Sequence, residues 1–153
     1  MSYFRESRNA ELSVIYYLED AIGTDWTGIT VVKRFTDAYK SPLPVVAISL
    51  TETYNNRKEI GANTLLNDYT ITVDIFAKSD GQRIDLADYI MDKLKDGCVY
   101  YTHSQTAGVL SRTADGRLHI NRFSLNHKVD LGDEGVDVYD RFRHFIQLTV
   151  RKN

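Results

Sequence analysis

The segment "DYTITVDIFAKSDGQRIDLADYIMDKLKDG", residues 68–97, constrains the fold of this chain more than any other. Its first half alternates between apolar and polar side chains, which predicts a β-strand with Asp74 on its polar face. "SDGQ" follows, and the spacing of Ser79 and Gln82 predicts a capping box at the start of a helix. Five apolar residues at helical spacing then predict an amphipathic helix that ends at Gly97. These five are Ile84, Ala87, Ile90, Met91 and Leu94.

The remaining elements follow from the same reading of periodicity and turn residues. A helix is expected over 7–22, with Ser7 as N-cap and Gly23 as its stop. Strands are expected over 28–35, 45–53, 98–104, 117–126 and 138–150. The longest connections are a polar loop over 54–67, a segment containing Gly108 and Gly116, and an acidic loop over 127–137.

This order of elements predicts an α+β fold in a single domain, residues 1–153. Runs of consecutive strands favour antiparallel pairing over βαβ crossovers. We therefore expect a mostly antiparallel sheet of about five to six strands, with two helices packed on one face.

Composition excludes several classes of protein. Lys and Arg total 19 and Asp and Glu total 21, so no overall basic charge attracts nucleic acid or anionic lipid. The most apolar stretch, "LPVVAISL", is too short to span a bilayer, and the N-terminus lacks the apolar core of a signal peptide. We expect a soluble protein made in a cytoplasm, with no membrane partner.

The sequence contains no recognisable catalytic, metal or cofactor motif. Neither of the Gly-rich phosphate-binding motifs occurs, nor does the nucleophile elbow G-x-S-x-G. The four histidines are not spaced as zinc ligands, and the acidic 130–137 segment differs from a calcium loop. Cys98 and His103 are too far apart along a strand to form a thiol–imidazole pair. We predict no enzyme activity and no cofactor; a small enzyme or ligand-binding domain would need a pocket around Asp74 or Cys98.

Asp74 is better explained without chemistry. General acid–base catalysis needs a second titratable group within reach, and no such partner stands at a recognisable spacing. Because Asp74 shares its predicted face with Thr70 and Thr72, we interpret it as part of a polar, partly exposed face of the sheet.

The last strand offers two interpretations. Its odd positions begin with Tyr139, Arg141, Arg143 and Phe145, so one face interleaves basic and aromatic groups. Such a face could stack single-stranded nucleic acid. It could equally be covered by another subunit, because Arg and Tyr are enriched in protein interfaces.

The order of four segments resembles a known family. An N-terminal helix is followed in order by "SPLPVVAISLTE", "NDYTITVDIFAKS", "GQRIDLADYIMDKL" and "YDRFRHFIQLTVRK". The pattern spans roughly residues 8–150. This pattern resembles the tail terminator, or tail completion, proteins of tailed bacteriophages. The resemblance implies an α+β subunit of a hexameric ring that caps the tail tube, fixes tail length and meets the neck or connector. It implies a virion protein assembled in the host cytoplasm, with DNA passing through the ring without sequence-specific contacts.

Within that resemblance, interface roles rest on residue pattern alone. The 54–67 loop mixes charges with apolar side chains, which suits contact with a neighbouring subunit or the tube. The alternatives are a nucleic-acid-binding module using the last strand and another neck or connector protein of similar fold. The candidate interface residues are Tyr54, Arg57, Lys58, Glu59, Ile60, Leu65, Leu66, Tyr139, Arg141, Arg143 and Phe145.

Overall fold

One seven-stranded sheet, in the order β1-β5-β6-β7-β4-β3-β2, forms the frame of the protein. The computed structural model describes residues 2–57, 59–61, 65–129 and 138–152. The strands are β1 (Ser2–Tyr3), β2 (Thr30–Val32), β3 (Val45–Arg57), β4 (Leu65–Phe76), β5 (Cys98–Thr106), β6 (Val109–Lys128) and β7 (Arg143–Lys152). The helices are α1 (Glu6–Asp25), α2 (Phe35–Ala38) and α3 (Asp80–Leu94). All strand pairs are antiparallel except β2 with β3, so the predicted α+β class is confirmed.

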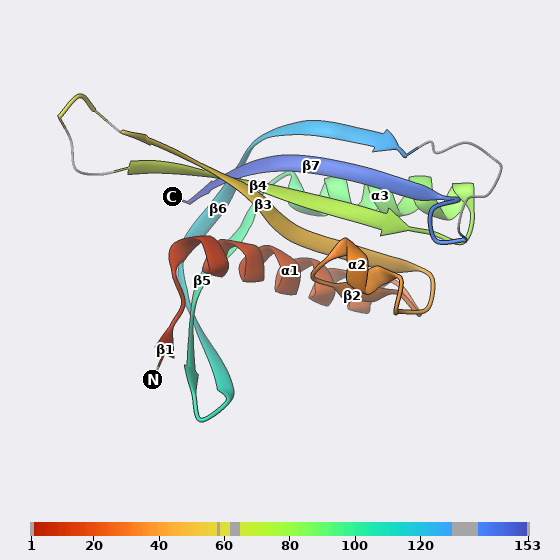
Figure 1. Ribbon diagram of the computed structural model, residues 1–153, viewed down its shortest axis with the longest axis horizontal. Helices are drawn as coiled ribbons and strands as arrows, with labels where there is room; N and C mark the ends of the chain where they lie inside the picture. Colours follow the sequence, from red (N-terminus) through yellow and green to blue (C-terminus); the bar gives the residue numbers. More distant parts are fainter. Residues whose placement is uncertain (1, 58, 62–64, 130–137, 153) are drawn as a thin grey trace.

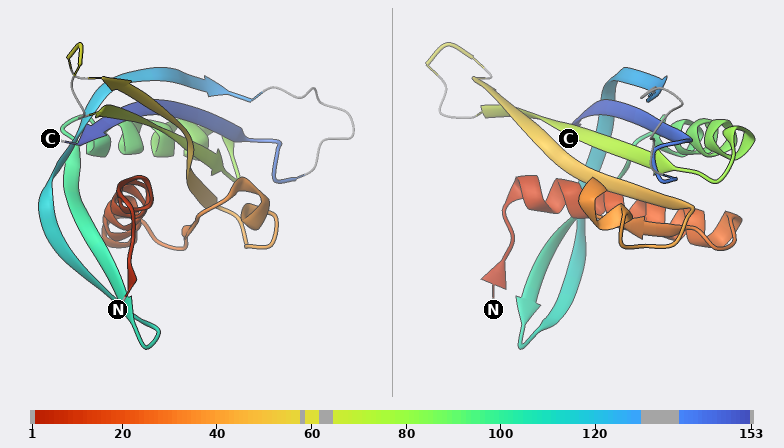
Figure 2. Two further views of the ribbon diagram at one scale, coloured as in Figure 1. Left: turned by 60° about the vertical axis from the view of Figure 1, so that its left-hand side comes forward. Right: turned by 45° about the vertical axis from the view of Figure 1, so that its right-hand side comes forward.

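The two long helices pack on the same face of this sheet, as predicted. The sheet curls around α1, and α3 lies beside β7 on that same inner side (Figures 1 and 2). Alternate residues of β7 point inward, which gives the strict buried–half-buried alternation expected of a half-covered strand. The main core joins apolar residues of α1 and α3 to those of β3, β4 and β7. The short helix α2 was not predicted, and its Ala38 packs in a second cluster with Val45, Ala47 and Phe76.

Helix α1 hydrogen-bonds to β5 and β3, each the second strand from one end of the sheet, at positions that the short edge strands β1 and β2 do not pair. On β5, the backbone N–H of Tyr101 donates to Ser13 Oγ and that of His103 donates to Asn9 Oδ1, both at a distance of 3.0 Å. The backbone N–H of Leu50, on β3, donates over 2.8 Å to a carboxylate oxygen of Glu11, also on α1. Strand edges carry unpaired backbone groups, and this helix supplies them with side-chain acceptors.

The limits of α1 differ from the predicted ones. The helix runs past Gly23 to Asp25, and it begins at Glu6 after an N-cap residue, Arg5, whose side chain makes no capping bond. Ser7 therefore lies inside the first turn and is not the N-cap. Gly23 lies within the helix and does not end it. It is exposed, and no atom lies within 4 Å of the position that a Cβ would take.

The predicted capping box of α3 is confirmed, with one change of partner. The Gln82 N–H donates to Ser79 Oγ over 3.2 Å, while the Gln82 side-chain oxygen accepts from the backbone of Lys78 instead of Ser79. Ala87, Ile90 and Leu94 are buried as expected, and Met91 is half-buried. Leu86, which the predicted stripe did not include, is also buried. Ile84, assigned to the same apolar stripe, is exposed; the buried position one residue earlier belongs to Arg83.

Two predicted connections are strand instead. Strand β3 continues to Arg57 and β4 begins at Leu65, so seven of the ten described residues of the predicted 54–67 loop belong to a β-ribbon. Strands β5 and β6 also extend through 105–116 and turn at Ala107 and Gly108, both with positive φ. Ribbons with polar or exposed side chains lack the alternating hydrophobicity that identifies a half-buried strand.

The two end strands of the predicted set are shorter than expected. Strand β2 covers only 30–32 of the predicted 28–35, and β7 begins at Arg143 instead of residue 138. Residues 138–142 form turns that precede β7. The predicted 127–137 loop begins later, because β6 runs to Lys128, and its 130–137 part lies outside the described residues.

Candidate functional site

A hairpin arm projects from the sheet where β3 and β4 outrun their neighbours (Figure 1). The pairing of β4 with β7 ends at Asp68 and Arg151, whereas the pairing of β4 with β3 continues to Leu65 and Arg57. We define the hairpin arm as residues 52–57, 65–67 and the turn residues 59–61. Two-stranded ribbons are marginally stable alone in water, so such an arm gains stability from a surface that covers it.

The arm carries most of the predicted loop-derived interface residues. Tyr54 and Leu65 are about half exposed and Ile60 is fully exposed, whereas Leu66 is half-buried. Tyr54 donates through its hydroxyl to Glu52 over 2.9 Å. Arg57 and Glu59 are also exposed, and Lys58 lies outside the described residues. Exposed apolar side chains gathered on one projection are typical of an interaction surface.

The outer face of the sheet, opposite α1 and α3, holds a buried ion pair. Two guanidinium nitrogens of Arg143 donate to Asp74 Oδ1 over 3.2 and 2.9 Å. Arg143 also lies 3.4 Å from Asp140 and 5.0 Å above the ring of Phe76. Burial raises the pKa of Asp74, and the hydrogen bonds and charge of Arg143 oppose that rise. Asp74 is only 5% exposed, so the expectation of a partly exposed residue is wrong.

A second ion pair repeats the arrangement at the other end of β7. Arg151 donates to both carboxylate oxygens of Asp68, over 2.8 and 2.9 Å, from the directly opposite position on β4. Arg143 and Arg151 are therefore both neutralised by carboxylates of the same neighbouring strand. The basic and aromatic face of β7 is therefore less able to bind a nucleic-acid backbone. Such binding needs Lys or Arg side chains that can neutralise phosphates and release the counterions of the nucleic acid.

Two of the candidate residues before β7 do not share that face. Tyr139 lies in the turn before the strand, where it donates to the backbone oxygen of Ser41 over 2.7 Å and packs against the second apolar cluster. Arg141 lies in the same turn and is exposed. Phe145 is on β7, with its ring 5.8 Å from that of His127. The predicted odd face therefore includes Arg143 and Phe145 but not Tyr139 or Arg141.

A groove of about 840 Å³ opens beside the Asp74–Arg143 pair. We call it the Asp74 groove; its lining includes Phe35, Leu50, Thr72, Asp74, Arg143 and Phe145. Both hydrogen bonds from Arg143 end on Asp74 Oδ1, and Oδ2 accepts none from the described residues. The groove thus offers apolar surface beside the carboxylates of Asp74 and Glu11, which suits binding of an apolar group with a nearby donor.

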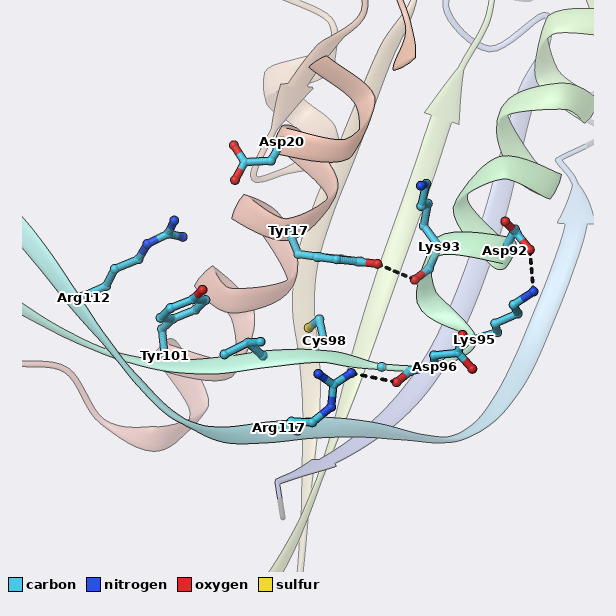
Figure 3. A pocket seen from close by; sticks show the side chains of 12 residues that line it. Tyr17, Asp20, Asp92, Lys93, Lys95, Asp96, Cys98, Tyr101, Arg112 and Arg117 are labelled. Atoms are coloured by element: carbon cyan, nitrogen blue, oxygen red, sulfur yellow. Dashed lines mark hydrogen bonds and ion pairs between the residues drawn. The ribbon is translucent and has the colours of Figure 1, made fainter. Parts of the chain in front are cut away.

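A second pocket, of about 560 Å³, lies between α1 and the β5–β6 hairpin (Figure 3). Tyr17 crosses it and donates to the backbone oxygen of Lys93 over 2.8 Å, while Arg117 donates to that of Asp96 over 3.0 Å. Cys98 lines the pocket and is buried, and burial raises the pKa of its thiol to about 11. A neutral thiol is a poor nucleophile.

The geometry does not assemble a Cys98–His103 pair. His103 is buried, stacks on Phe4 and turns its Nδ1 toward Asn9 Oδ1, 3.0 Å away. Its Nε2 has no hydrogen-bond partner among the described residues. Burial lowers the pKa of His103, so the ring is neutral near pH 7. His103 is thus held by Asn9 and Phe4, in a structural setting.

Metal and membrane features are also limited in the described part of the chain. No three His, Cys, Asp or Glu side chains gather there as a metal site. None of the helices in those residues has the length and apolar character needed to cross a membrane.

The features with the strongest physical case for a function are therefore the hairpin arm and the Asp74 groove. Sequence reasoning located the arm by its mixture of charged and apolar residues, but it missed the groove, which needs α2 and three strands together. The carboxylate partners Asp68 and Asp140 were also missed. In comparisons with known proteins, no protein-family model and no curated sequence matches this chain.

Proposed function

We propose that this chain is a structural subunit of a bacteriophage tail. Copies assemble into a ring, with six as the expected number, at the head-proximal end of the tail. The ring caps the tail tube, fixes its length and joins the tail to the neck. Its partners are other copies of the chain, the tail tube protein and a neck or connector protein, and DNA passes through the ring.

The observation that carries this proposal is the hairpin arm. A monomer would expose Tyr54, Ile60 and Leu65 on a two-stranded ribbon that has no cover among the described residues. Covering that ribbon with another subunit removes apolar surface from water and supports its backbone pairing. The order of elements, from the N-terminal helix to the final strand, agrees with the family resemblance. The fold alone does not specify function, so the proposal depends on assembly.

Light scattering after size-exclusion chromatography, with electron microscopy of the same fractions, tests this function. We expect rings with a central hole, and rings that bind one end of purified tail tubes. The control is Val109→Asp, which places a charge on an exposed apolar residue away from the arm and should leave assembly unchanged. A chain that stays monomeric even with tail tube protein would contradict the proposal. Rings that bind the connector but never the tube would indicate another neck protein.

A further inference from the structure

We infer that the Asp74 groove of one copy receives the tip of the hairpin arm, residues 59–61, from a second copy of the chain. This inference rests on the proposed function, because it describes how copies of the subunit would contact one another. It adds the surface that accepts the arm, which neither the sequence pattern nor the resemblance identifies.

The two surfaces cannot meet within one chain. The groove includes Ser49 and Thr72, at the paired middle of β3 and β4, and the arm is the far end of the same two strands. The eight-residue step along β3 from Ser49, in the groove, to Arg57, near the tip, spans roughly 26 Å at ~3.3 Å per residue. Bending the arm back would break the β3–β4 pairing from Glu52 to Arg57. An arm tip that enters this groove must therefore come from another copy of the chain.

The same separation specifies the type of contact. The arm and the groove are different surfaces, so each copy donates one and accepts through the other. Such a contact is heterologous, and copies that repeat it form a ring when the rotation between neighbours closes and an open filament when it does not. A symmetric dimer would instead place the same patch of both copies together.

The arm tip and the groove both present apolar side chains. Ile60 is fully exposed at the tip, and the groove presents apolar surface from Phe35, Leu50 and Phe145. Phe35 is 49% exposed, on a helix that is anchored to the sheet through Ala38. Asp74 Oδ2 can accept an N–H from the incoming turn.

Charge adds a second match at the rim. Lys33, Arg34 and Glu11 line the groove. Arg34 lies 3.7 Å from Asp37, and Glu11 accepts from the backbone of Leu50, whereas Lys33 is exposed and has no carboxylate partner among the described residues. Glu59 stands next to Ile60 at the tip and is also exposed. Seating Ile60 in the groove brings this carboxylate to the same rim as the ammonium group, and opposite charges there favour one orientation of docking.

Cysteine cross-linking tests the contact directly. The only native cysteine, Cys98, is buried and its thiol is neutral, so it contributes little background. The variant carrying both Ile60→Cys and Phe35→Cys is treated with a short bismaleimide. We expect a ladder of covalent oligomers up to the ring. A mixture of the two single variants should give covalent dimers only, and each single variant alone should remain monomeric on a denaturing gel.

A matched control places the second cysteine elsewhere. Ile60→Cys combined with Val109→Cys, on the exposed β5–β6 turn, should give no ladder. Dimers from Ile60→Cys alone, or equal cross-linking to Val109→Cys, would overturn the inference. If wild-type rings are seen but the groove pair does not cross-link, the groove assignment fails while the proposed function stands. Absence of wild-type rings is the separate failure of that function.

Charge exchange provides an independent readout. Glu59→Lys and Lys33→Glu should each weaken association by roughly two- to fivefold, the range of a rim ion pair, and the double variant should recover it. Melting curves of the three variants check that each remains folded. Equal weakening in the single and double variants would exclude this pairing.

Discussion

The guanidinium Nη1 of Arg83 lies 2.7 Å from Nδ1 of His144, and both side chains are buried. Because a guanidinium can only donate, Nδ1 of His144 must accept, and the proton of the neutral ring is on Nε2. That nitrogen then donates to Asn126 Oδ1. Burial, and then the charge of Arg83, lower the pKa of His144 from 6.5 to about 4.

This relationship predicts a loss of stability in mild acid. The folded state favours neutral His144, so its contribution is complete above pH 6.5 and is lost as the pH falls toward 4. The free energy of unfolding should decrease by about 3 kcal/mol across that window from this group alone. Urea unfolding at half-unit pH steps measures it. His144→Gln should flatten the dependence, whereas His127→Gln, at an exposed histidine, should retain it. Identical slopes in wild type and His144→Gln would contradict the lowered pKa of His144.

The Asp74–Arg143 pair should respond unequally to removal of either partner. Arg143→Met leaves Asp74 buried without a cation, and we expect a loss of ~3–5 kcal/mol in unfolding free energy. Asp74→Asn keeps a neutral acceptor, and Arg143 still has Asp140 at 3.4 Å, so the loss should be nearer 1–3 kcal/mol, roughly that of one buried hydrogen bond. Chemical denaturation measures both, and Arg141→Met, at an exposed turn residue, is the control. A greater loss from Asp74→Asn would refute this order.

Gly97 and Gly23 should respond to alanine with opposite signs. Gly97 has φ of 75°, and a Cβ there would stand 2.1 Å from the backbone oxygen of Leu118. Left-handed strain alone costs about 1–2 kcal/mol, so Gly97→Ala should destabilise the protein by more than that. Gly23 lies in α1 with open space around it, and alanine should stabilise it by roughly 0.5–1 kcal/mol. Thermal melts of the two variants test the pair, and a neutral Gly97→Ala would be inconsistent with this close approach.

Ser79 and Ser7 form another matched pair. Ser79 caps α3 through its hydroxyl, so Ser79→Ala should cost about 1 kcal/mol. Ser7 lies inside the first turn of α1 and makes no cap, and Ser7→Ala should change stability by less than about 0.5 kcal/mol. Equal losses in the two variants, measured by urea unfolding, would show that the cap on α3 contributes nothing specific.

Local sequence signals account for the parts of the fold that were predicted well. The β4–α3 segment combines period-2 alternation, a capping box and a helical stripe within thirty residues, and each signal acts between near neighbours. The hairpin arm was predicted as a loop because its polar side chains carry no such alternation. Its strands exist through pairing with each other, which a propensity reading of either strand does not reveal.

The candidate site depended on contacts that only the register supplies. Asp74 and Arg143 are 69 positions apart in the chain, and they meet because β4 and β7 pair in one particular register. Tyr139 and Arg141 match the alternation of the β7 sequence, but both lie in the turn before the strand and are not on its face. A period of two identifies a face only where the strand has already begun.

The hydrogen bonds that join α1 to both β5 and β3 have a consequence for the order of folding. Its side chains accept from Tyr101 and His103, which are 88 and 94 positions away along the chain. During synthesis this helix emerges before β5, and its acceptors on this side stay without their partners until β5 has left the ribosome. Contacts of such sequence separation form slowly, because the intervening chain must lose its freedom before they form. Helix α1 therefore completes its contacts only after the chain as far as β5 has been made.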